Sequence, residues 1–243
     1  MDLTYVPALR IQRELYTLPR GMERFWAYIH TMTDADTGDL ALPLVAMNPM
    51  GKDHLPRFLD ALLALDADAA GAAATTDAAL ALGHEEGEYK VLLVVSDDAK
   101  GGWTSRFASE FGYRFEQRPM YRRGFIVALL WTSEEYTPAR IREEVLMCIY
   151  RAAYVRRNGF ASTLGEMIAQ EREAMQRAGV TEPAIDADDL EYTRDVLAPL
   201  MPKTDRATLM AAMFGDPAAR ELGYDPLGLS PRAGLALARQ LQM

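Results

Sequence analysis

Cysteine is nearly absent from this chain: Cys148 is the single one in 243 residues. No disulfide can therefore form within the chain, which agrees with a reducing compartment. The first ten residues carry Asp2 and lack the apolar core of a signal peptide. No apolar run approaches the roughly 20 residues that cross a bilayer. These absences predict a soluble, cytoplasmic protein that does not insert into membranes.

Positive charge is also scarce, with 26 Lys and Arg against 35 Asp and Glu and a net charge of -9. Broad binding to a nucleic-acid backbone needs a basic surface, so a nucleic-acid partner is disfavoured. One segment runs against this balance, because arginines alternate with aromatic residues over 113–123. It fits either an anionic partner or a connector whose rings pack inward while its guanidinium groups stay in water.

The familiar catalytic motifs are missing as well. The sequence has no His-Glu-x-x-His, no Gly-x-Ser-x-Gly, no Walker A motif and no Gly-x-Gly-x-x-Gly fingerprint. Zinc is disfavoured by the single cysteine and by three scattered histidines. Motifs therefore leave open whether this protein is an enzyme.

Three apolar runs stand out, at 40–47, 90–95 and 125–131, and each is followed by a polar turn and a helical pattern. This alternation predicts an α/β fold with a small, mostly parallel sheet of three to five strands flanked by helices. Pro43 cannot donate to a sheet ladder, so it moves the first strand to an edge or delays its start. A further short strand is predicted at Tyr113–Phe115.

Helical signals dominate the remainder. Thr137 and Pro138 begin a long helix that ends at Asn158, with Cys148 on its apolar stripe and therefore expected in the core. From about residue 160 no strand signal remains, and the chain predicts a helical C-terminal region. We therefore expect an α/β domain with N-terminal helices at 1–159 and a helical region packed on it at 160–243.

Helix caps divide that C-terminal region. Thr163 and Glu166 have the spacing of a capping box, and Asp186 and Thr204 are expected to cap the next two helices. In the N-terminal half, the alanine-rich helix at 67–82 is expected to be interrupted near Gly71.

Polar side chains gather where the three predicted strands end. Loops after parallel strands converge at one edge of a sheet, and ligands bind there. Asp97 and Asp98 are candidates for catalysis and for holding Mg²⁺, and His54 for acid–base catalysis. Lysines and glycines before a helix can approach a phosphate. The predicted ligand-binding residues are Lys52, Lys100, Gly101, Gly102, Thr104, Ser133 and Glu134.

A plainer interpretation exists for each loop. Residues 97–104 fit an acidic turn with a glycine-rich helix entry, and His54 fits a solvated helix start. Two functions therefore stay open. One is a hydrolase or transferase that binds a small anionic, phosphate-bearing ligand at the strand-end loops. The other is a non-catalytic interaction or assembly protein, such as a homo-oligomer, that acts through its helices.

Overall fold

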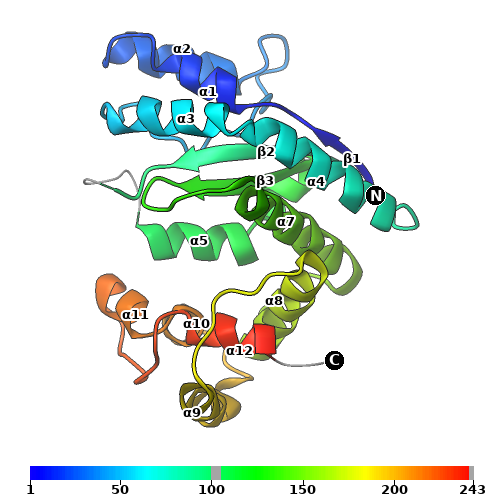
Figure 1. Cartoon of the computed structure of the whole chain (residues 1–243), viewed down its shortest axis with the longest axis vertical. Coiled ribbons are helices and arrows are strands. Elements are labelled where there is room, and N and C mark those ends of the chain that lie inside the picture. The colour runs from blue at the N-terminus through cyan, green and yellow to red at the C-terminus, as the bar shows by residue number, and fades with distance from the viewer. Residues whose placement is uncertain (100–104, 241–243) are drawn as a thin grey trace. The chain divides into compact units, whose positions relative to one another are not determined.

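The computed structural model describes residues 1–99 and 105–240 and confirms the predicted α/β class (Figure 1). Three parallel strands form the sheet in the order β1-β2-β3. They are β1 (Asp2–Tyr5), β2 (Glu88–Ser96) and β3 (Phe125–Trp131). The two predicted strands at 90–95 and 125–131 are therefore confirmed, and they pair from Lys90↔Phe125 to Ser96↔Trp131. Their continuous apolar runs are buried because helices cover both faces.

The strand predicted at 40–47 is wrong. This segment forms turns and contributes one isolated antiparallel bridge, between Thr33 and Leu40. The Leu44 and Met47 amides donate to the carbonyls of Leu42 and Leu44, so the backbone bonds stay local around Pro43. Leu42, Leu44 and Met47 are nevertheless buried. The apolar run therefore signals burial, and no strand is needed to explain it.

Strand β1 pairs with β2 instead, from Asp2↔Glu88 to Tyr5↔Val91. Tyr5, the last residue of β1, explains why position 71 is a glycine. Gly71 lies within α4 (Ala67–Ala81) and does not interrupt the helix. A Cβ at Gly71 would lie 2.6 Å from the ring of Tyr5. Gly71 therefore allows β1 and α4 to approach closely, and the predicted helix break is wrong.

Gln12 continues the edge of the sheet beyond the end of β1. It lies on α1 (Leu9–Leu15) and is fully buried. Its Nε2 donates to the Leu93 carbonyl over 2.9 Å, and its Oε1 accepts from the Val95 amide over 2.9 Å. These are the bonds that a neighbouring strand would make to β2, so one side chain replaces part of a strand.

The remaining regular elements described up to residue 158 are helices. The helix at Tyr113 to Phe115 contradicts the short strand predicted there. The bounds are α2 (Met22–Met32), α3 (His54–Ala64), α5 (Arg106–Phe115), α6 (Arg118–Arg122) and α7 (Pro138–Asn158). As predicted, the Thr137 hydroxyl accepts from the Arg140 amide at the start of α7. Cys148 is only partly buried, although Val145 and Ile149 beside it are in the core.

The chain divides into two compact units. The first contains Met1–Arg106 and Arg118–Ile149, and the second contains Phe107–Gln117 and the chain from Tyr150 onward. The predicted boundary at residue 159 differs from this division, because α7 crosses from one unit to the other and most of α5 belongs to the helical unit. Among residues 1–99 and 105–240, no helix is long and apolar enough to cross a membrane.

The second unit is helical, as predicted. Its further elements are α8 (Leu164–Ala178), α9 (Ala187–Leu197), the 3-10 helix η1 (Ala198–Leu200), α10 (Arg206–Phe214), α11 (Asp216–Leu222) and α12 (Ala233–Gln240). The capping box of Thr163 and Glu166 and the Asp186 cap are confirmed. The α10 cap is Asp205, which accepts from the Thr208 amide, and not Thr204.

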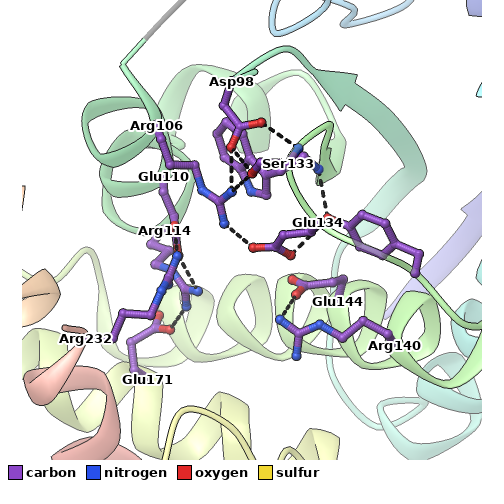
Figure 2. A network of polar contacts seen from close by, with 12 residues as sticks. Asp98, Arg106, Glu110, Arg114, Ser133, Glu134, Arg140, Glu144, Glu171 and Arg232 are labelled. Atoms are coloured by element: carbon purple, nitrogen blue, oxygen red, sulfur yellow. Dashed lines mark hydrogen bonds and ion pairs between the residues drawn. The ribbon is translucent and has the colours of Figure 1, made fainter. Parts of the chain in front are cut away.

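A buried ion-pair cluster lies inside this second unit. Glu171 is fully buried and accepts from Arg151 at 2.7 and 3.0 Å and from Arg114. Arg114 also pairs with Glu110, which accepts two bonds of 2.7 Å from Arg232 (Figure 2). Burial would raise the pKa of Glu171, but the Arg151 and Arg114 charges outweigh it and lower that pKa. Arg114, part of the arginine–aromatic segment, is therefore committed to internal pairs.

Candidate functional site

Residues 48–54 form a fixed loop in the first unit, although no strand precedes them. The Asn48 carbonyl accepts from the Tyr16 hydroxyl at 2.5 Å and from the Gly51 amide at 3.0 Å. The buried Arg24 guanidinium stacks over the Tyr16 ring, and its Nη1 donates to the carbonyls of Pro49 and Gly51 at 3.5 Å. Helix α3 then begins at His54. The loop is therefore held from behind by α1 and α2.

Asp97 is the centre of the site. It directly follows β2 and is 3% exposed. Its Oδ2 accepts from Asn48 Nδ2 at 2.9 Å, and its Oδ1 lies 2.8 Å from His54 Nε2 and 3.3 Å from the Thr132 hydroxyl. The other ring nitrogen of His54, Nδ1, is buried and has no hydrogen-bond partner among the described residues. Three separate segments thus meet at one carboxylate, and two of them, at Asp97 and Thr132, directly follow strands.

Asp98 belongs to a second, adjoining network (Figure 2). Its carboxylate accepts from Arg106 at 2.7 Å and from the amide and hydroxyl of Ser133 at 3.0 and 2.6 Å. Arg106 also pairs with Glu134 and lies over the Trp131 ring. Burial would raise the pKa of Asp98, but the hydrogen bonds from Ser133 and Arg106 and the Arg106 charge outweigh it and lower that pKa. This network joins the ends of β2 and β3 to the first residue of α5.

Tyr136 extends the Asp98 network through Glu134. The Tyr136 hydroxyl accepts from the Trp131 amide at 2.8 Å and donates to Glu134 at 3.2 Å. Burial, followed by the nearby negative charge of Glu134, raises the pKa of Tyr136. The phenol therefore stays protonated and acts as a fixed hydrogen-bond donor.

A pocket of about 610 Å³ opens beside His54. That volume lies in the range of small-molecule sites. The side chains of Lys52 and Arg57 are exposed on its lining and form no ion pair within the described ranges. The pocket is lined by Lys52, Asp53, His54, Arg57, Phe58, Ala99 and Thr132. The lining thus includes two positive side chains and one carboxylate, that of Asp53, around a space large enough for a small ligand.

The structure brings some of the predicted site residues together and separates others. His54 and Asp97 form a direct pair, and Lys52 lines the pocket with His54. Asp98, Ser133 and Glu134 are engaged with Arg106. Four predicted residues lie outside the described ranges, namely Lys100, Gly101, Gly102 and Thr104.

Sequence reasoning missed four residues that build this site: Asn48, Arg57, Arg106 and Thr132. Arg57 had a usable signal, because it lies one helical turn after the candidate Lys52-His54 segment. Thr132 also had one, since it directly follows a clean strand. Asn48 was visible only as a turn residue, and Arg106 had no local signal.

The Mg²⁺ hypothesis gains no ligand set from the structure. Among residues 1–99 and 105–240, no three His, Cys, Asp or Glu side chains are grouped so that they could hold a metal ion. Asp97 and Asp98 both accept hydrogen bonds from neighbouring side chains. The metal role of Asp97 and Asp98 therefore stays a sequence-based prediction.

Comparison with known proteins gives one partial likeness. Over 74 residues the chain is 35% identical to the uncharacterized protein YjfC of Bacillus subtilis (strain 168). This match covers 30% of the chain and 25% of that protein. No family model matches the chain, and no solved structure matches it. The likeness therefore transfers no activity.

Proposed function

We propose that the first unit binds a small anionic, phosphate-bearing molecule in the pocket beside His54 and acts on it as a hydrolase or transferase. The observation that carries this proposal is the pairing of His54 with the buried Asp97 at the wall of a pocket whose lining includes Lys52 and Arg57. Ligands of parallel α/β sheets bind at this edge. The proposal therefore rests on position and on charge together.

The two cations of this pocket are available to a ligand. Some arginines of the first unit are already paired, namely Arg13 with Asp60, Arg142 with Asp77 and Arg106 with Asp98. Lys52 and Arg57 have no such partner within the described ranges. A phosphate group offers the acceptors that both a guanidinium and an ammonium group need. The Phe58 ring supplies an apolar wall for the rest of such a ligand.

His54 supplies the acid–base chemistry in this proposal. The oxygen of a water molecule or an alcohol attacks phosphorus while its proton moves to the His54 imidazole. The bond from phosphorus to the leaving oxygen breaks, and its electron pair stays on that oxygen. The imidazolium then returns the proton to the leaving oxygen. Asp97 stabilises the positive ring between these steps, and Lys52 and Arg57 offset the negative charge of the phosphoryl group.

Calorimetry with the full chain tests the binding step. Pyrophosphate and ribose 5-phosphate are titrated with and without Mg²⁺ into the wild type and into Lys52→Gln and Arg57→Gln. Loss of one charge-assisted contact is expected to weaken binding about tenfold in each variant. Arg10→Gln is the matched control, because Arg10 is an exposed arginine of the same unit away from the pocket. No heat with either compound, or equal affinity in all variants, contradicts the proposal.

A phosphate-release assay tests the catalytic step. His54→Gln is expected to abolish turnover of any ligand that binds, with affinity changed much less. Unchanged turnover in this variant would contradict the catalytic role of His54, and only the binding part of the proposal would remain.

One observation favours the non-catalytic alternative. On α2, Met22 is 59% exposed and Trp26 is 53% exposed, and their spacing places them on one face. A second copy of the chain is the simplest partner for such a face. Sedimentation at increasing concentration tests it: a dimer that Trp26→Ser dissociates, in a protein that binds no phosphate compound, would favour this function.

A further inference from the structure

We propose that Asn48 is a positioning residue which, acting through Asp97, places the proton of the neutral His54 ring on Nε2 and leaves Nδ1 as a proton acceptor. The consequence for chemistry rests on the proposed function, because it identifies the ring atom that would take a proton from an attacking hydroxyl group. The hydrogen-bond pattern itself belongs to the ligand-free chain and can be tested alone.

The orientation of the Asn48 amide is fixed by its own loop. Its Oδ1 accepts from the Met50 amide at 3.1 Å, and a backbone N–H can only donate. The opposite end of the same amide, Nδ2, must therefore be the atom that lies 2.9 Å from Asp97 Oδ2. The usual ambiguity between the oxygen and nitrogen of an asparagine side chain is thus removed by geometry.

The Asp97 carboxylate connects the fixed Asn48 amide to the His54 ring. Its Oδ2 is used by an amide donor, which leaves Oδ1 to accept from His54 Nε2 at 2.8 Å. The Thr132 hydroxyl accepts from the Asp98 and Ala99 amides, and its single proton lies between Asp97 Oδ1 at 3.3 Å and Asp98 Oδ1 at 3.1 Å. Because an ionised carboxylate has no proton to give, the proton in the His54 bond belongs to Nε2.

The surroundings of Nδ1 point the same way. This atom is buried and has no hydrogen-bond partner among the described residues. A buried N–H without an acceptor is costly, so the neutral ring is expected to favour the Nε2–H form at least fivefold, about the ratio set by that cost. A group that binds Nδ1 must therefore be a donor. A hydroxyl group or a water molecule qualifies and a fully ionised phosphate oxygen does not; because Nδ1 is buried, the ring or its neighbours must move for such a donor to reach it.

Nitrogen NMR of the three histidines tests this assignment. Spectra are recorded near pH 8.5, where an ordinary imidazole is neutral. His54→Gln identifies the His54 signals, and the exposed His84 is the internal reference. The wild type is expected to show a protonated Nε2 and an unprotonated Nδ1 at His54. A proton on Nδ1, or a mixture like that of His84, overturns the proposal.

Asp97→Asn tests the role of Asn48. The Asn48 amide still donates to whichever atom faces it, so Asn at position 97 must turn its oxygen toward Asn48 and its NH₂ group toward His54. Nε2 then becomes an acceptor, and the His54 proton is expected to move to Nδ1. In Asn48→Ser/Asp97→Asn the serine hydroxyl still accepts from Met50, but the orienting NH₂ group is gone, so a mixture is expected. An unchanged tautomer in Asp97→Asn overturns the role of Asn48.

A third variant covers the case in which Asp97→Asn fails to fold. In Asn48→Ser alone, the His54 Nε2–H proton is expected to exchange with water faster than in the wild type, because Asp97 is held less firmly. Equal exchange rates overturn the proposal. The two proposals can fail separately. If calorimetry detects no phosphate binding but the tautomers are as expected, the proposed function is contradicted and the role of Asn48 stands.

Discussion

The two buried polar clusters of this chain differ in how completely their atoms are paired. In the helical unit, both oxygens of Glu171 accept from arginines, and Glu110 is paired with Arg114 and Arg232. In the sheet unit, Asp97 is held by uncharged Asn48 and by His54, whose Nδ1 has no partner among the described residues. The second cluster borders the pocket beside His54. We expect from this difference that the first cluster serves stability, and the proposed function assigns the second to a ligand.

The largest expected effect is on the paired cluster. Glu171→Gln leaves the buried Arg151 without a countercharge, so the free energy of unfolding of the helical unit should fall by about 3–5 kcal/mol. Urea denaturation measures it. Glu173→Gln is the matched control, since it changes an ion pair on the same helix that is partly exposed and worth under about 1 kcal/mol. Equal losses in the two variants would remove the distinction between the clusters.

The second effect concerns the sheet edge, which we expect to matter more for the stability of the first unit than the site does. Gln12→Leu keeps the size of the side chain but leaves the Leu93 carbonyl and the Val95 amide without partners. Each unsatisfied group is costly, so unfolding should become easier by about 2–4 kcal/mol. Hydrogen exchange at Val95 should rise strongly. Wild-type protection at that amide would contradict the strand-like role of Gln12.

The contribution of Asp98 to stability should depend on pH. The folded-state pKa of Asp98 lies below its ordinary value, because Ser133 and Arg106 outweigh the effect of burial. Its contribution to stability is therefore full above the unfolded-state pKa, about 3.9, and is lost as the pH falls through the folded-state pKa. Asp98→Asn should lower the melting temperature at pH 7 and narrow the difference from wild type at about pH 3. A constant difference at both pH values would contradict this.

The smallest effect is expected at the centre of the site. Asp97→Asn keeps an acceptor for Asn48 and a donor toward His54, but it places a proton on the buried Nδ1 without an acceptor, so stability should fall by about 1 kcal/mol. The same substitution should abolish turnover of any phosphate ester, because the ring proton is misplaced. Thermal melts and the phosphate-release assay on one preparation measure both. A stability loss as large as that of Glu171→Gln would assign Asp97 to structure.

Local signals account for what the sequence predicted of the fold. The runs at 90–95 and 125–131 are long, apolar and free of proline, so burial on both faces and strand formation coincide. Strand β1 was missed because it has four residues with no strong apolar pattern. At 40–47 burial and strand formation separate, because Pro43 prevents continuous pairing while its apolar neighbours still face the core.

Part of the site was predictable for a related reason. The apolar residues before Asn48 anchor the loop in the core, so His54 reaches Asp97 even though the expected strand is absent. The roles of Asn48 and Arg106 could not be predicted, because Asn48 meets Asp97 and Arg106 meets Ser133 only once the sheet has assembled. Hydrogen bonds of this kind leave no periodic trace in a single sequence.

The most direct test of the pocket is to follow His54 by NMR while pyrophosphate is added to the full chain. Binding beside Lys52 and Arg57 should shift the His54 ring signals in proportion to occupancy, with the exposed His84 unchanged. The shifts should persist in Arg10→Gln and require about ten times more ligand in Arg57→Gln. His54 signals that stay constant up to millimolar pyrophosphate, or that move equally with those of His84, would contradict a phosphate site in this pocket.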